Sequence, residues 1–232
     1  KILDSVEISC NQDAVNVEKF KSAFALRGLS AHLPEGDSLK DTIFYDLLNK
    51  ILAYLKNKTF SAFVKLTRNP YVRSFAEESL RIDARNLESQ CDSALKNAVP
   101  LYAADILKIR GDAEKFDDLK KAVRFFETET FFDSKEKPSS AALRNFLDKI
   151  SAPYFEKKSA NLEWEICAKK LCGGALEFMD FFRSKSQAAL LPEEVLSMCV
   201  SSVELGKKSF RRSKESLPLL DWVEIFWSMA PH

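Results

Sequence analysis

The sequence contains few of the residues on which most enzyme classes depend. Only two of its 232 residues are histidine, His32 and His232, so a catalytic triad or a zinc site has almost nothing to draw on. The motifs HExxH, GxSxG, GxGxxG and GxxxxGK[ST] are all absent. Adjacent carboxylates such as Asp117 and Asp118 point about 100° apart on a helix, so they do not converge on one substrate. We therefore expect a non-enzymatic protein with no catalytic residue, no metal ion and no cofactor.

Glycine is also scarce. The chain has six glycines, which leaves little material for β-turns, bulges or phosphate-binding loops. Hydrophobic residues make up 46% of the chain and charged residues 30%, a balance typical of globular proteins. Because the apolar residues recur three and four positions apart, they indicate amphipathic helices. We predict an all-α fold, a bundle of about nine to eleven helices in two or three packed subdomains.

Cysteine is sparse, with five residues and no CxxC pair, which excludes a disulfide scaffold. Cys91 and Cys199 lie on apolar stripes and are expected to be buried as small hydrophobic residues. Cys167 and Cys172 are the closest pair and the candidate disulfide. In one continuous helix they lie about 7.5 Å apart along the axis, which is too far for a bridge. They pair only if the helix breaks before Cys172, which Gly173-Gly174 permits.

Capping residues and apolar stripes predict where the helices lie. Asp37 or Ser38 and then Thr59 are suited to N-caps, and Asn69 must end a helix because it precedes Pro70. The predicted helices are 17–28, 39–56, 60–66, 72–99, 100–111, 113–130, 141–150, 160–171, 175–190, 193–205 and 219–229.

A charged, proline-containing segment at 133–140 is the expected boundary between subdomains. It separates N-terminal helical subdomains at 1–132 from a C-terminal helical subdomain at 141–232. No run approaches the roughly 18 apolar residues that a membrane span requires. We therefore expect contact with a membrane only through a lipid anchor attached outside this sequence.

Charge is nearly balanced, with 35 Lys and Arg against 34 Asp and Glu, which excludes the bulk electrostatics of a nucleic-acid-binding protein. One basic cluster stands out and can attract an anionic surface with a strength that falls as salt rises. The alternative is a solvated connector that complements the dipole of the preceding helix. The cluster comprises Lys207, Lys208, Arg211, Arg212 and Lys214.

Phenylalanine is abundant, with 18 residues, some of them in adjacent pairs. We expect Phe125-Phe126 and the group Phe178 with Phe181-Phe182 to pack in the core or in a seam between subdomains, and the alternative is exposure as binding anchors. Trp222 and Trp227, five residues apart, lie on different helix faces. One of them can pack inside while the other binds a partner, which makes the pair a candidate binding site next to the basic cluster.

The segment DSLKDTIFYDLL at 37–48 combines a helix cap with an apolar stripe, and the expected helices of the whole chain are rich in Lys, Glu, Ser, Leu and Phe. In these features the chain resembles the helical merozoite surface antigens of Babesia. The resemblance implies a lipid-anchored ectodomain at the parasite surface that attaches to red cells. Its partner would then be a host cell-surface protein or an anionic glycan. The alternative is an intracellular helical scaffold or adaptor that accepts a partner helix in a groove.

Overall fold

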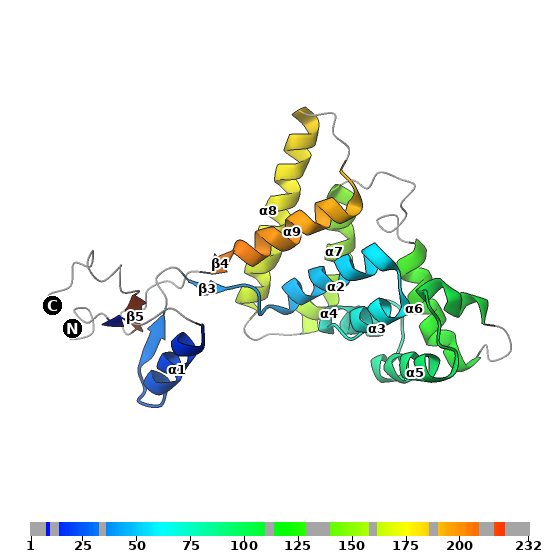
Figure 1. The fold of residues 1–232 in the computed structure, drawn as a ribbon, viewed down its shortest axis with the longest axis horizontal. Helices are drawn as coiled ribbons and strands as arrows, with labels where there is room; N and C mark the ends of the chain where they lie inside the picture. Colours follow the sequence, from blue (N-terminus) through cyan, green and yellow to red (C-terminus); the bar gives the residue numbers. More distant parts are fainter. Residues whose placement is uncertain are drawn as a thin grey trace. The chain divides into compact units, whose positions relative to one another are not determined.

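The computed structural model describes residues 8–9, 14–32, 36–109, 114–128, 140–157, 162–185, 190–208 and 216–220 (Figure 1). The predicted all-α class is confirmed, because these ranges hold nine α-helices and their strands are only two to five residues long. The chain forms two compact units, one of residues 1–38 with 207–232 and one of residues 39–206.

Helices build the larger unit throughout. α4 packs on α7, α2 packs on α3 and α9, and α8 packs on α7 and α9 (Figure 1). In chain order the elements are α2 (Ile43–Asn57), α3 (Phe60–Thr67), α4 (Pro70–Glu78), α5 (Ala84–Asn97), the 3-10 helices η2 (Ala103–Lys108) and η3 (Glu114–Phe116), α6 (Asp117–Thr128), α7 (Ser140–Lys157), α8 (Glu163–Lys185) and α9 (Pro192–Leu205).

In its described residues, the smaller unit combines one helix with short strands. Its elements are β1 (Ile8–Ser9), α1 (Ala14–Ala25), β2 (Ser30–His32), β3 (Asp37–Ser38), β4 (Lys207–Lys208) and β5 (Ser216–Leu220). β5 lies between β1 and β2 and pairs with both in parallel, and β3 pairs with β4 in antiparallel fashion. The buried side chains of Val17 and Leu219 pack together in this unit.

β5 corrects the predicted helix at 219–229, because Leu219 and Leu220 belong to a strand. Their backbone partners, Ile8 and Ser9, lie at the other end of the chain. Helical spacing within 219–229 carries no information about partners so distant in sequence. The rest of that predicted helix lies outside the described residues.

An aromatic cluster forms the centre of the larger unit. The rings of Tyr54, Phe63 and Phe126 contact one another, with centroids 5.7 Å apart for Tyr54–Phe63, 5.6 Å for Phe63–Phe126 and 6.3 Å for Tyr54–Phe126. Phe146 of α7 meets Phe126 of α6 at 6.1 Å. Side chains from both sides of the segment 133–140 therefore share one core. The compact units divide at 38/39 and 206/207 instead of at the predicted boundary.

The predicted cap at Thr59 and the predicted helix boundary at Asn69 are both found. Thr59 accepts a hydrogen bond from the amide of Ala62 at 3.3 Å and begins α3. Asn69 separates α3 from α4 and caps α4, with Pro70 in its first turn. α2 is capped by Thr42, so the prediction of Asp37 or Ser38 as the cap of this helix is wrong. Leu39 is nevertheless fully buried, as its place on the apolar stripe predicted.

The predicted helix 72–99 is two helices. α4 ends at Glu78, Arg81 takes a positive φ of 56°, and Asp83 caps α5 through the amide of Asn86 at 2.9 Å. No glycine or proline marks this break. The apolar spacing continues across it because Ile82 in the turn is buried as well.

Two predicted breaks do not occur. α7 continues through Pro153, where Tyr154 packs on Tyr71 of α4 with ring centroids 4.3 Å apart. α8 continues through Gly173-Gly174. Because α8 is unbroken, the condition for a disulfide between Cys167 and Cys172 is not met. Both are free thiols, so the predicted pair is wrong.

Candidate functional site

The structure describes only part of the predicted binding region. Lys207 and Lys208 form β4 in the smaller unit, with Lys207 exposed and Lys208 half-buried. The other basic residues of the predicted cluster, Arg211, Arg212 and Lys214, and the two tryptophans, Trp222 and Trp227, lie outside the described residues. The roles predicted for these residues stay predictions.

The phenylalanine groups differ in how far they are buried. Phe126 is buried, and Phe125 packs on the same core, as predicted. The group at the end of α8 is not in the core: Phe178 is 60% exposed, Phe181 63% and Phe182 49%. Exposure of three large aromatic side chains on one helix is the alternative that the sequence left open.

Phe178 faces an open hollow between α8 and α9, about 560 Å³ in volume. Met198 and Leu205 of α9 also line this hollow and are 41% and 82% exposed. We call Phe178, Met198 and Leu205 the α8–α9 face. Large apolar side chains that gather around a hollow at the surface mark an interaction site more strongly than single exposed residues do.

Small and polar residues also line the hollow. At Gly174 the backbone of α8 borders open space, since a Cβ at that position would meet no atom within 4 Å. Ser197 and Ser201 line the opposite side, and the Ser202 hydroxyl donates to the Leu171 carbonyl at 3.3 Å. The hollow thus combines apolar edges with hydroxyl groups that can donate or accept a hydrogen bond.

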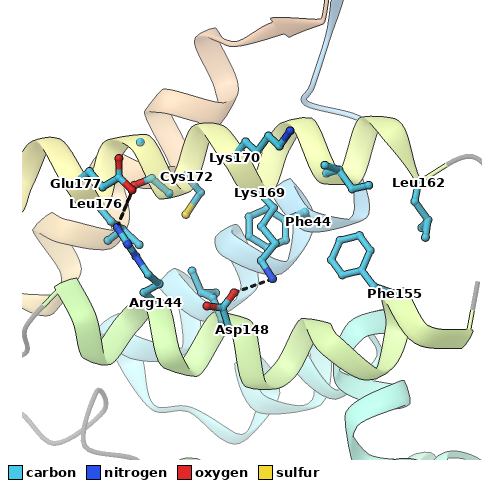
Figure 2. Close-up of a pocket in the computed structure, with 14 residues that line it drawn as sticks. Phe44, Arg144, Asp148, Phe155, Leu162, Lys169, Lys170, Cys172, Leu176 and Glu177 are labelled. Carbon is cyan, nitrogen blue, oxygen red and sulfur yellow. Dashed lines mark hydrogen bonds and ion pairs between the residues drawn. The ribbon is translucent and has the colours of Figure 1, made fainter.

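A second cavity, about 720 Å³ in volume, lies between α7 and α8 (Figure 2). Phe44 of α2 lies behind it. Its other apolar lining residues are Leu147, Phe155, Leu162, Ile166, Cys172 and Leu176. Its size falls in the range of small-molecule sites, and its mainly apolar lining is typical of them.

Two ion pairs connect α7 and α8 across this second cavity (Figure 2). Lys169 Nζ lies 2.7 Å from the Asp148 carboxylate, and Arg144 lies 3.6 Å from Glu177. Lys169 also donates to the Ser151 hydroxyl at 2.8 Å and approaches the Phe155 ring at 5.4 Å. Because Lys169 and Arg144 are already paired within the protein, an anionic ligand would have to displace a carboxylate to bind either of them.

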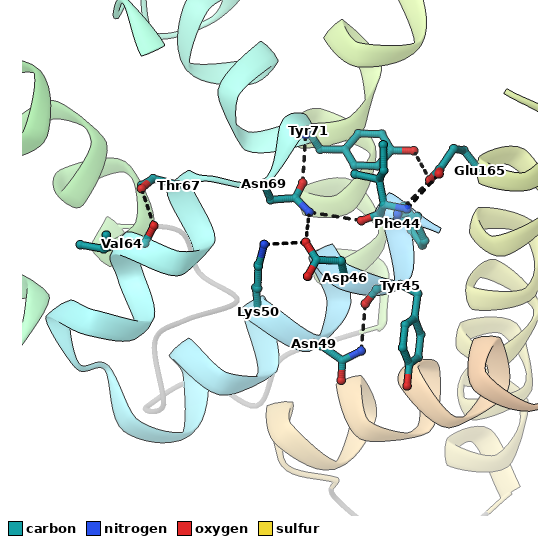
Figure 3. Close-up of polar contacts among 11 residues, drawn as sticks. Phe44, Tyr45, Asp46, Asn49, Lys50, Val64, Thr67, Asn69, Tyr71 and Glu165 are labelled. Atoms are coloured by element: carbon teal, nitrogen blue, oxygen red, sulfur yellow. Dashed lines mark hydrogen bonds and ion pairs between the residues drawn. The ribbon is translucent and has the colours of Figure 1, made fainter. Parts of the chain in front are cut away.

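Glu165 holds the start of α8 against α2 (Figure 3). Its two carboxylate oxygens accept from the first two amides of α2, those of Ile43 at 2.9 Å and Phe44 at 2.8 Å. The Tyr71 hydroxyl donates to the same carboxylate at 2.9 Å. A carboxylate at a helix N-terminus satisfies unpaired amides and complements the helix dipole. Glu165 thus fixes the helix that carries Phe178.

A second polar group supports the same helix end. Asn69 donates to the Ile43 carbonyl at 3.2 Å and to the Asp46 carboxylate at 2.8 Å, while Lys50 pairs with Asp46 at 2.6 Å (Figure 3). The Asn69 side-chain oxygen accepts from the Tyr71 amide at 2.9 Å. Asn69 is fully buried, so its contacts join α2 to α4 at a position closed to solvent.

Within the described ranges, no three His, Cys, Asp or Glu side chains gather in the way that a metal site requires. No helix in the same ranges is both long enough and apolar enough to cross a membrane. Searches against protein-family models, curated proteins and solved structures give no match to this chain.

Proposed function

We propose that this chain is a non-enzymatic interaction protein that binds a partner protein through the α8–α9 face, and that the interaction serves adhesion to a host cell surface. The observation that carries the proposal is the exposure of Phe178, Met198 and Leu205 around one open hollow. Burying a large aromatic residue in a partner's pocket is the commonest source of binding energy at protein interfaces.

Helix packing and hydrogen bonds hold the two helices that carry this face. Glu165 fixes the N-terminal end of α8, and Ser202 joins α9 to α8 beside the hollow. A pre-organised surface binds more tightly than a mobile one because less conformational freedom is lost on association. The buried contacts of α8 therefore favour a binding role for its exposed residues.

The cell-surface part of the proposal rests on two features of the sequence. The first is that residues 37–48 and the Lys-, Glu-, Ser-, Leu- and Phe-rich composition of the helices resemble those of Babesia merozoite surface antigens. The second is the basic cluster that begins at Lys207, which would speed encounter with an anionic cell surface. The lipid anchor and the host receptor, whether a protein or an anionic glycan, belong to this proposal.

Cell binding by surface variants tests the proposal. Purified protein carrying Phe178→Ser together with Leu205→Ser should bind red cells at least tenfold more weakly than the unchanged protein, measured by flow cytometry over a concentration series. Leu101→Ser is the matched control, because Leu101 is 65% exposed and does not line the hollow. Binding that is equal in all three folded proteins would contradict the role of the face.

The second candidate function is an intracellular adaptor that accepts a partner helix in the same hollow, since a groove between two helices fits an amphipathic helix. Antibodies raised against the purified chain separate the two functions. Labelling of intact cells of the source organism supports adhesion. Labelling that appears only after the cells are permeabilised supports the adaptor.

A further inference from the structure

Two buried thiols meet where α8 packs on α9. Cys172 of α8 and Cys199 of α9 are both free, with at most 1% of either residue exposed. The Cys199 thiol interacts with the side chain of Cys172, and both residues lie in the same buried core. The register of the helices agrees, because Ser202, one turn along α9 from Cys199, bonds to the carbonyl of Leu171.

No other pair of described cysteines is arranged in this way. Cys167 lies on the same continuous helix as Cys172, five positions before it, which geometry forbids as a bridge. Cys91 is buried in α5, and its thiol has Thr67 as a hydrogen-bond partner. Burial raises the pKa of the Cys91 thiol to about 12.

Cys172 is also the member of the pair that lies next to a cavity, although only 1% of it is exposed. It lines the cavity of about 720 Å³ between α7 and α8, beside Gly173 and Gly174, which carry no side chain there. Cys199 lines neither of the two cavities described above. The neighbouring Cys172 side chain and burial raise the pKa of the Cys199 thiol.

We propose that Cys172 and Cys199 form an intramolecular disulfide when the protein meets a low-molecular-weight disulfide such as oxidised glutathione. The Cys172 thiolate attacks one glutathione sulfur, forming a mixed disulfide and releasing one glutathione thiolate. The Cys199 thiolate then attacks the Cys172 sulfur and releases the second glutathione thiolate. The two protein thiols lose two electrons, and these reduce one glutathione disulfide to two glutathione thiols.

The bridge joins α8 to α9 beneath the α8–α9 face. Leu171 and Gly174, which flank Cys172, and Met198, which precedes Cys199, all line the hollow. Oxidation therefore fixes the two sides of the hollow to each other by a covalent bond. This modification goes beyond the proposed binding function and does not depend on it.

Peptide mapping of the whole 232-residue protein tests the proposal. The reduced, folded protein is incubated with oxidised glutathione, alkylated and digested without reductant, and its peptides are identified by mass spectrometry. We expect a cross-linked peptide pair containing Cys172 and Cys199, and the loss of two alkylatable thiols. The pair should persist in Cys167→Ser, the matched control on the same helix, and disappear in Cys199→Ser.

Three outcomes would overturn the proposal: both thiols still alkylated at equilibrium, Cys172 cross-linked to another cysteine, or a bridge that forms only in urea. Circular dichroism of the oxidised unchanged protein checks that its helix content is kept. If Cys199→Ser fails to fold, the map of the unchanged protein alone decides. Cell binding is measured separately, so its loss or survival bears on the proposed function and leaves the disulfide to the peptide map.

Discussion

The hydroxyl of Tyr71 donates a hydrogen bond of 2.9 Å to the carboxylate of Glu165, 94 positions away in the sequence. The same carboxylate accepts the first two amides of α2. Three helices, α2, α4 and α8, are thus joined at one buried group. The position of α8, and with it the α8–α9 face, depends on this group.

Replacing Glu165 with Gln should destabilise the protein by about 2–4 kcal/mol, because an amide cannot accept all three hydrogen bonds and leaves buried donors unpaired. Urea denaturation followed by circular dichroism measures the loss. Glu156→Gln is the matched control, since Glu156 is exposed on α7, and we expect it to change stability by less than about 0.5 kcal/mol. Equal effects of the two variants would contradict the structural role of Glu165.

Stability should fall steeply above pH 10. Burial, followed by the nearby carboxylate of Glu165, raises the pKa of Tyr71, and burial with the Glu127 hydrogen bond raises that of Tyr54. The unfolded chain therefore loses these protons at lower pH than the folded protein. The stabilisation is complete below about pH 10 and declines by about 1.4 kcal/mol per pH unit for each tyrosine above it.

Urea denaturation at pH 9, 10 and 11 measures this decline. The double variant Tyr54→Phe with Tyr71→Phe lacks both hydroxyl groups, so its stability should fall less steeply over the same range. Absorbance at 295 nm should show that two of the five tyrosines ionise only as the protein unfolds. An unchanged slope in the double variant would refute the assignment.

Gly173→Ala and Gly174→Ala should each stabilise the protein by about 0.5–1 kcal/mol. Both glycines lie inside α8, and a Cβ at either position would meet nothing within 4 Å. Alanine restricts the unfolded chain and favours the helix. The midpoint of urea denaturation measures the gain, and a loss of stability would show that α8 bends at these residues.

Gly206→Ala is the control with the opposite sign. A Cβ on Gly206 would overlap the side chain of Leu171, and Leu39 lies close by. We expect a loss of about 1 kcal/mol, because the half-buried Leu171 side chain must move aside and the Ser202 carbonyl is close as well. A stabilising effect here would mean that the contact between the end of α9 and α8 is looser than in the structure.

Reversing the charge of Lys207 and Lys208 to Glu should slow association with red cells and flatten the dependence of binding on salt. Long-range attraction acts mainly on the association rate and is screened within about 8 Å at physiological ionic strength. Association rates at 50 and 300 mM NaCl measure the effect. Lys96→Glu with Lys108→Glu, two lysines of α5 and η2, makes the same change in net charge and is the control. Equal slopes in both double variants would contradict steering by the basic cluster.

The fold class and much of the local structure follow from the sequence alone. Helix N-caps such as Thr59, and the boundary at Pro70, depend on chemistry within one turn of the backbone, so nearby residues determine them. The buried stripe of α2, from Phe44 to Leu55, follows for the same reason, because apolar side chains spaced three and four apart must share one face.

The sequence was least informative where distant residues compete with local preference. Gly173-Gly174 and Pro153 favour breaks, yet α7 and α8 continue because their buried side chains pack on neighbouring helices. The turn at Arg81 ends a helix without glycine or proline. The sequence identified the phenylalanine cluster of α8 as unusual, but whether Phe178 is buried depends on which helices pack against it.

Only the tertiary structure brings Glu165 to the start of α2, places Cys172 against Cys199 and opens the hollow beside Phe178. These contacts join residues that are tens of positions apart. No local pattern encodes them, because each results from the summed packing of several helices. The sequence alone therefore determined which segments are helical and which faces are apolar, and the packing of those faces decided which side chains meet and which stay exposed.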